Sequence, residues 1–417
     1  MANILLKNKV TNSTNVLVIT ENFKNEFNLP DKVNDYIVNE LSQKDKKTLT
    51  YNYIGKFISI FIVEKGKEIS FLNEQLRRHG SIVADSVNLN KGKDLYIYNQ
   101  TKQQSLSLFA AEGMVLGNYQ FIKHKPTAEK NKNTLQSIII ANTNIKQSHI
   151  DELNIVCSAT ILARDLVNEP VNYLNATDLS NAFKTMGKLS GFKVDVLNRK
   201  KIKELKMGGL LAVNAGSVDE PTFSVMEYKP NKPKNKKPYI LIGKGVVYDT
   251  GGLSLKPTLA SMDLMKCDMA GAAAVGCAMY AIAKAKLNIH VIALVPATDN
   301  RPGFNAFAPG DIITMMDGST VEMLNSDAEG RMILADALHY AKRFNPELVI
   351  DIATLTGAAM AAIGTFGMVG MGNISNNQKN KLHQSGINVY ERIAEFPFWD
   401  EYDELMKSDI ADQKNIG

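Results

Sequence analysis

The 417-residue sequence has little cysteine, tryptophan and histidine, and only a small excess of positive charge. Three cysteines are too few, and odd in number, for a disulfide framework, which excludes a small disulfide-stabilised secreted domain. The first residues, Met1 to Lys7, contain no long apolar stretch typical of a signal peptide. With 45% hydrophobic and 22% charged residues, the chain is neither disordered throughout nor collagen-like. We therefore expect a globular, cytoplasmic protein of two or three domains.

One uncharged segment, Ile352–Gly372, raises the question of a membrane span. A spanning helix needs about 20 mostly apolar residues. This segment has the length but contains five glycines and three threonines. We expect it to form a buried wall of a functional site instead, and we expect no membrane association.

The formal net charge of +5 says little about partners, although five lysines fall within Lys229–Pro238. A basic run interrupted by proline can bind nucleic acid through phosphate contacts. This one has no aromatic side chain to stack on bases. We interpret it as a solvated loop and consider nucleic acid an unlikely partner.

Residues 1–150 are predicted to form a first, smaller α/β domain, because strand-like runs alternate with helical segments. The predicted strands are 16–20, 57–63, 94–98 and 137–141, and the predicted helices are 73–86 and 104–116. No glycine-rich phosphate loop or catalytic cluster is found there.

Residues 151–417 are predicted to form a second domain with a parallel or mixed sheet and helices on both faces. Short apolar runs typical of strands buried on both faces are 239–243, 289–295 and 348–353. The predicted helices are 150–167, 269–286 and 329–343. Ligands of such sheets bind beyond the carboxyl ends of the strands, so the residues after each strand are the candidates for chemistry.

Four acidic residues occupy such places. Asp249 follows the first strand and Asp268 precedes a helix. A predicted hairpin at 312–322, with Asp317-Gly318 at its turn, leads to Asp327 and Glu329. If the segment before the last helix is extended, residues two apart share a face, and these two carboxylates would converge.

Four acids at one edge of a sheet repel each other unless cations neutralise them. Two divalent ions bridged by carboxylates are one solution, and oxygen ligands suit Mg²⁺, Mn²⁺ or Zn²⁺. No histidine lies in these segments. The alternative is that Asp249 and Asp327 are turn and cap residues, where aspartate is common; spacing alone leaves both interpretations open.

The motifs around these acids resemble those of the leucyl aminopeptidase family (M17, cytosol aminopeptidase). The resemblance covers residues from about 150 to the end, and Ser326 stands where threonine is commoner. The motifs are Ala163–Pro170, Met207–Val213, Gly243–Pro257, Asn325–Arg331 and Asp351–Gly357. The fold that this resemblance implies is an α/β/α sandwich with a mixed, largely parallel sheet, preceded by a smaller, macro-domain-like α/β domain.

The resemblance implies two metal ions and a set of ligands. One ion would be held by Lys244, Asp249, Asp268 and Glu329. The other would be held by Asp249, Asp327 and Glu329, so that Asp249 and Glu329 bridge. A lysine ligand must be a neutral amine, and a metal favours that form. Mn²⁺, Zn²⁺, Mg²⁺ and Co²⁺ all remain possible.

The implied activity is that of an aminopeptidase that releases N-terminal residues from peptides. The metals would bind the substrate's α-amine and carbonyl oxygen and lower the pKa of a bridging water. Lys256 would stay cationic and stabilise the oxyanion. Arg331 would hold a bicarbonate ion that shuttles protons, because its planar fork suits planar oxyanions. Alternatively, Lys244 and Lys256 are surface lysines and Arg331 pairs with a nearby acid.

Four further residues match family positions that line the side-chain pocket or contact the substrate backbone: Met265, Thr354, Leu355 and Gly357. An apolar residue such as Met265 favours leucine-like or methionine-like N-terminal residues. Selectivity should be broad, because one methylene group in an apolar pocket changes the free energy that discriminates two substrates by only about 1–3 kcal/mol.

Two alternative functions remain at this point. One is a dipeptidase of narrow specificity, such as a Cys-Gly dipeptidase of glutathione breakdown. The other is a nucleic-acid-binding regulatory protein that keeps the peptidase fold, against which the intact ligand set argues. The resemblance also implies a homohexamer built as a dimer of trimers, in which the first domain serves assembly.

Family members continue beyond a stretch that resembles Ser408–Gly417. We therefore expect the second domain to lack its last part, which would include one helix and one wall of the pocket. The loss of a core helix can exceed the roughly 5–15 kcal/mol that stabilise a whole domain. The 417-residue chain is accordingly predicted to be less stable or less active than a longer one.

Overall fold

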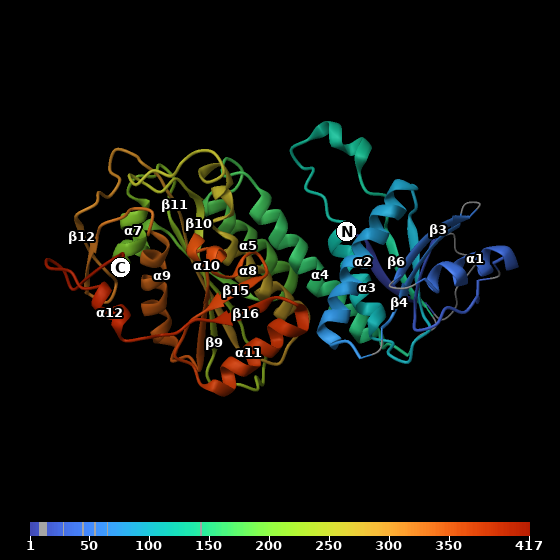
Figure 1. Cartoon of the computed structure of the whole chain (residues 1–417). Helices are drawn as coiled ribbons and strands as arrows, with labels where there is room; N and C mark the ends of the chain where they lie inside the picture. Colours follow the sequence, from blue (N-terminus) through green and yellow to red (C-terminus); the bar gives the residue numbers. More distant parts are fainter. Residues whose placement is uncertain (8–14, 28, 44–45, 54–55, 65, 142–143) are drawn as a thin grey trace. The chain divides into compact units, whose positions relative to one another are not determined.

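The computed structural model describes residues 1–7, 15–27, 29–43, 46–53, 56–64, 66–141 and 144–417. The chain divides into two compact units (Figure 1). The first consists of Met1–Ile161 with Gln384–Glu391, and the second of Leu162–His383 with Arg392–Gly417. Each unit is described separately below.

The first unit is built on a six-stranded sheet in the order β1-β6-β5-β2-β4-β3. All neighbouring pairs are parallel except β3 with β4. The strands are β1 (Asn3–Lys7), β2 (Asn15–Thr20), β3 (Thr48–Tyr53), β4 (Lys56–Ile62), β5 (Asp94–Asn99) and β6 (Ser137–Ala141). The four strands predicted in this region are β2, β4, β5 and β6, whereas the edge strands β1 and β3 were not predicted.

Strand β2, in the middle of this sheet, lies between two hydrophobic cores. Its apolar run is buried on both faces, as expected of a central parallel strand. Leu17 and Ile19 belong to the core shared with α2 (Ile69–Leu89), α3 (Leu106–Gly117) and α4 (Gln147–Asn168). Val16 and Val18 belong to the opposite core, shared with α1 (Asp31–Leu41). The two helices predicted for this region correspond to α2 and α3, and α4 corresponds to the helix predicted at 150–167 as the start of the second domain.

Helices α2 and α3 touch through their backbones. A Cβ atom at Gly113 would lie 1.9 Å from the carbonyl oxygen of Arg77, and one at Gly80 would lie 2.3 Å from that of Ala110. No side chain larger than a hydrogen fits at either position, so glycine sets the distance between these helices.

His79 of α2 is buried, and its Nε2 lies 2.9 Å from Oγ of Ser59 in β4. Burial lowers the pKa of His79 from 6.5 to about 4. The unfolded chain therefore takes up a proton at a higher pH than the folded chain. Stability is fully present above pH 6.5 and is lost as the pH falls through this window, by about 3 kcal/mol in total.

We therefore expect the free energy of unfolding to fall more steeply with acid in the wild type than in His79→Gln. Urea unfolding at pH 7.5, 6, 5 and 4.5 measures this difference. His149→Gln, at an exposed histidine, is the control and should follow the wild type. Parallel pH profiles for the wild type and His79→Gln would contradict the expectation.

The second unit contains a mixed sheet in the order β14-β9-β11-β8-β7, with β10 also paired to β11. Strands β9, β10 and β14 run parallel to their neighbours, whereas β8 runs antiparallel to both β11 and β7. The bounds are β7 (Lys193–Leu197), β8 (Thr222–Tyr228), β9 (Tyr239–Gly243), β10 (Gly245–Asp249), β11 (Val291–Asn300) and β14 (Leu348–Ile352). The expected mixed, largely parallel sheet is confirmed, although β7, β8 and β10 were not predicted.

Helices cover both faces of this sheet, as predicted (Figure 1). Ile292 and Leu294 of β11 pack in one core with α7 (Gly208–Asn214) and α9 (Gly330–Ala341). The other face is covered by α5 (Ala176–Ser190) and α8 (Ala270–Lys284). Short helical segments in this unit are α6 (Arg199–Glu204), η2 (Met262–Cys267) and η3 (Lys342–Phe344). In the first unit, η1 spans Pro126–Asn131.

The predicted hairpin is present as β12 (Asp311–Thr314) and β13 (Thr320–Met323), with Gly318 at positive φ in its turn. A short strand, β17 (Gln413–Lys414), pairs with β13. The remaining elements are α10 (Gly357–Ile363), β15 (Gly367–Gly370), α11 (Asn376–Val389), β16 (Arg392–Glu395) and α12 (Glu401–Leu405).

The uncharged segment Ile352–Gly372 is not one long helix, because it contains the end of β14, the short helix α10 and strand β15. Among the residues that the structure describes, no helix is both long and apolar enough to span a bilayer. The expectation of a buried wall was wrong for most of the segment. Met360 and Phe366 are 62% and 70% exposed, since nothing else in the described chain covers them.

The lysine-rich segment Lys229–Pro238 is a loop between β8 and β9, and its lysines are exposed. Asn235 is buried within it and donates to the carbonyl oxygens of Lys237 and His290. The Asn235 amide therefore helps to hold a loop whose lysines face solvent, and the prediction of a solvated loop is confirmed.

Candidate metal centre

The predicted acidic residues meet near the carboxyl ends of the parallel strands β9 and β10. Lys244 directly follows β9, and Asp249 is the last residue of β10. Asp268 lies between η2 and α8, and Glu329 precedes α9. All four are almost completely buried. One ligand oxygen from each of Asp249, Asp268 and Glu329 can be chosen so that these atoms lie within 4.8 Å of one another.

Lys244 is the counter-ion of two of these acids. Its Nζ lies 2.8 Å from Oδ2 of Asp268 and 2.9 Å from Oε1 of Glu329. It also donates to the carbonyl oxygen of Thr354 at 3.2 Å. Gly330 makes room for this side chain, because a Cβ there would lie 2.6 Å from Cε of Lys244.

Lys256 connects the third acid to Asp327. Its Nζ lies 3.0 Å from Oδ2 of Asp249 and 2.5 Å from Oδ1 of Asp327. The Lys256 side chain is 15% exposed and that of Asp327 is 33% exposed, so this half of the site faces solvent. The cluster therefore has a closed side at Lys244 and an open side at Lys256.

The expected extended geometry of the segment from Asp327 to Glu329 was wrong. Asp327 lies in a turn, and Glu329 already has helical backbone angles as the N-cap of α9. The two carboxylates reach the same site because the turn at the start of the helix redirects the chain between them.

Burial controls the electrostatics of the closed side. It raises the pKa of Asp268 to about 6 and that of Glu329 to about 7, although the Lys244 charge acts in the opposite direction. Burial alone would lower the pKa of Lys244, but the charges of Glu329 and Asp268 outweigh it and raise that pKa. Without metal, the site therefore holds a buried ammonium among acids that are costly to ionise.

Of two residues that hold the site together, Asn300 was missed from the sequence and Thr354 was expected in another role. Asn300, the last residue of β11, donates from Nδ2 to Oδ1 of Asp249 at 2.9 Å. Thr354 donates from Oγ1 to Oδ1 of Asp268 at 2.8 Å, a contact different from the substrate role expected for it. Asn300 was missed because the strand was predicted to end at Val295, whereas β11 continues to Asn300, at the edge where ligands bind.

The other expected substrate residues surround the site less closely. Met265 lies half-buried in η2, three residues before Asp268. Leu355 is 44% exposed after Thr354. Gly357 begins α10, and a Cβ there would meet no atom within 4 Å.

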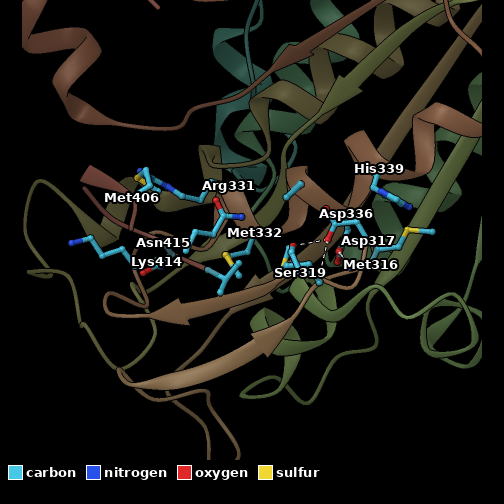
Figure 2. A pocket seen from close by; sticks show the side chains of 14 residues that line it. Met316, Asp317, Ser319, Arg331, Met332, Asp336, His339, Met406, Lys414 and Asn415 are labelled. Carbon is cyan, nitrogen blue, oxygen red and sulfur yellow. Dashed lines mark hydrogen bonds between the residues drawn. The ribbon is translucent and has the colours of Figure 1, made fainter. Parts of the chain in front are cut away.

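Arg331 is exposed in the first turn of α9, two residues after Glu329. In the described part of the chain it forms no ion pair with the acids of the cluster. It lines a pocket of about 200 Å³ between α9, the β12–β13 hairpin and the C-terminal segment. In Figure 2, Arg331 lies at one end of this pocket, near Met406 and Asn415.

The catalytic-domain model of the cytosol aminopeptidase family matches residues 161–417, more than half of the chain. The chain belongs to the cytosol aminopeptidase family. The resemblance seen in the sequence motifs is thereby confirmed, and the matched region contains every residue of the cluster.

Curated members of the cytosol aminopeptidase family are similar to this chain. The probable cytosol aminopeptidase of Chlorobaculum tepidum is 46% identical over 76% of this chain and 65% of its own length. That of Chlorobaculum parvum is 53% identical over 63% of this chain and 52% of its own. This chain thus spans about half to two thirds of these relatives. The probable cytosol aminopeptidase of Clostridium perfringens is 35% identical over all of this chain and 88% of its own length.

Two solved structures have a fold similar to that of this chain. A mutant of tomato leucine aminopeptidase superposes with a TM-score of 0.88 at 27% identity, covering all of this chain and 86% of the other. The bottromycin maturation enzyme BotP, solved in complex with Mn, gives 0.82 at 25% identity, covering 97% of this chain and 86% of its own. The aminopeptidase fold expected for this chain is confirmed.

Proposed function

We propose that this chain is a metal-dependent aminopeptidase that releases N-terminal residues, preferably leucine-like ones, from peptides. The observation that carries the proposal is the buried cluster of Asp249, Asp268 and Glu329 at the carboxyl ends of the parallel strands. Three buried carboxylates are rarely stable without cations. Membership of the cytosol aminopeptidase family agrees with this proposal.

The donor set fits divalent metal ions. Oε2 of Glu329 is buried and has no hydrogen-bond partner among the described residues. Lys244, Asp249, Asp268 and Glu329 would hold one ion, and Asp249, Asp327 and Glu329 a second. Carboxylate oxygens suit Mn²⁺, Zn²⁺, Mg²⁺ or Co²⁺. When bound, such ions supply Lewis-acid polarisation of a carbonyl group and acidify water.

The chain's own residues would bind the substrate and stabilise the charge that develops on it. Lys256 lies on the open side of the cluster, where its ammonium group can reach the substrate carbonyl oxygen and stabilise the negative charge that develops on it. Arg331 would hold a bicarbonate ion near the start of α9. Met265, Leu355 and Gly357 would receive the substrate, and the backbone at Thr354 would align it.

Hydrolysis of a leucine anilide with added Mn²⁺, with and without a chelator, tests this function. We expect activity in the wild type that either the chelator or Asp327→Ala abolishes. Glu204→Ala is the control, because it removes a surface acid paired with Lys201 at 3.0 Å and should leave the rate unchanged. Folded, Mn²⁺-loaded protein without activity would refute the proposal for this chain.

The first unit is proposed to serve assembly into a homohexamer in the cytoplasm. The proposal follows from the family resemblance alone. Analytical ultracentrifugation of the chain with and without residues 1–150 would test it, and a monomeric wild type would refute it.

A further inference from the structure

We infer that Asn300 is a positioning residue of the metal centre, which fixes the orientation of Asp249 and the spacing of the two ligand-bearing loops. The inference rests on the proposed metal-dependent function. It concerns a residue that lies outside the sequence motifs and would itself touch neither metal nor substrate.

Asn300 is completely buried at the end of β11. Its Nδ2 donates to Oδ1 of Asp249 at 2.9 Å and to the carbonyl oxygen of Ser326 at 3.0 Å. Its own carbonyl oxygen accepts from the backbone N–H and the hydroxyl of Thr250, at 3.1 and 2.8 Å. Both the side chain and the backbone of one residue therefore hold the loop that begins at Asp249.

These contacts decide which oxygen of Asp249 is available. Oδ1 also accepts from the backbone N–H of Gly251 at 2.8 Å. A carboxylate oxygen has two lone pairs, and two donors occupy both. Oδ2 is then the oxygen left for a cation, and it already faces the ammonium of Lys256. Asn300 thus selects the oxygen that Asp249 presents.

The second contact of Nδ2 links Asp249 to the other loop. Ser326 directly precedes Asp327, and its Oγ accepts from the N–H of Ser254 at 2.7 Å and donates to the carbonyl oxygen of Gly251 at 2.6 Å. Asn300 and Ser326 therefore tie residues 249–254 to residues 325–329. A neutral amide makes this link without adding charge to a site that already buries three carboxylates.

Titration of the metal-free full chain with Mn²⁺ in a calorimeter tests the inference. We expect Asn300→Ala to bind Mn²⁺ about 10–100-fold more weakly than the wild type, as is usual when the partner of a metal ligand is lost. The Mn²⁺ concentration needed for half-maximal activity should rise by a similar factor, while KM for a leucine anilide at saturating Mn²⁺ should stay unchanged.

Asn214→Ala is the matched control. Asn214 is equally buried, and its Nδ2 also donates twice, to the carbonyl oxygen of Asp219 at 2.8 Å and to Oγ1 of Thr298 in β11 at 3.1 Å. We expect it to lower the melting temperature of the metal-free protein about as much as Asn300→Ala does, and to leave Mn²⁺ affinity unchanged.

Wild-type Mn²⁺ affinity in Asn300→Ala would overturn the inference, and so would an equal loss of affinity in Asn214→Ala. If Asn300→Ala does not fold, Asn300→Ser is judged by the same two criteria. A wild type that binds no Mn²⁺ would instead refute the proposed function, and the inference with it, so the two failures are distinguishable.

Discussion

Replacing Lys256 with methionine should lower kcat for a leucine anilide by about 10²–10³-fold, the usual cost of losing one group that stabilises an oxyanion. Methionine keeps much of the apolar stem but removes the ammonium that lies 3.0 Å from Asp249 and 2.5 Å from Asp327. The carboxylates themselves remain, so Mn²⁺ binding should persist. Steady-state kinetics at saturating Mn²⁺, together with calorimetric Mn²⁺ titration, measure both effects.

Lys284→Met serves as the control for Lys256→Met. Lys284 lies at the far end of α8 and donates to the carbonyl oxygen of Leu189, at 3.4 Å. Its removal should leave kcat within a factor of two of the wild type. A Lys256→Met enzyme with wild-type kcat would show that the ammonium group has no part in catalysis.

Replacing Lys244 with methionine should destabilise the metal-free protein by about 3–5 kcal/mol, because it leaves buried carboxylates without their counter-ion. The loss should be largest at pH 8, above the raised pKa values of Asp268 and Glu329 in the wild type, and smaller in acid, where these groups take up protons. Mn²⁺ should restore part of that stability by supplying the missing positive charge. Urea unfolding in chelator and in Mn²⁺ measures the difference.

The control for Lys244→Met is Lys201→Met, which breaks an exposed pair of similar length, 3.0 Å from Nζ to Oε2 of Glu204. An exposed pair is worth roughly 0–1 kcal/mol. Equal losses in the two variants would mean that the buried ammonium does not stabilise the site, and that the acids are neutral in the metal-free protein.

Much of the fold could be predicted, because buried parallel strands leave a clear apolar signal. The run Tyr239–Gly243 predicted β9 without error. Strand β11 was predicted to end at Val295, since Pro296 and the polar residues after it are unusual in a central strand. The strand continues to Asn300 because tertiary pairing with β8 and β10 stabilises those residues. Tertiary contacts of this kind cannot be read from local sequence.

In the candidate site, too, some features have a local sequence signal and others depend on tertiary contacts. The acids could be predicted because motifs surround each of them, and the sheet brings Asp249, Asp268 and Glu329 together. The contacts of Asn300 and Thr354 could not, since each depends on the meeting of segments far apart in the chain. Their hydrogen bonds carry no sequence signal beyond the presence of a polar side chain at or shortly after the end of a strand.

The two lysines of the cluster have a consequence for the order of maturation. In many small metal-dependent domains, binding the metal and folding are one event, and a chelator unfolds the chain. Here Lys244 and Lys256 lie within ion-pair distance of four acids and partly balance their negative charge. We therefore expect the polypeptide to reach its native form before it acquires metal. The identity of the bound ion would then be set by whichever ions surround the finished protein, and exchange of one metal for another would need no unfolding.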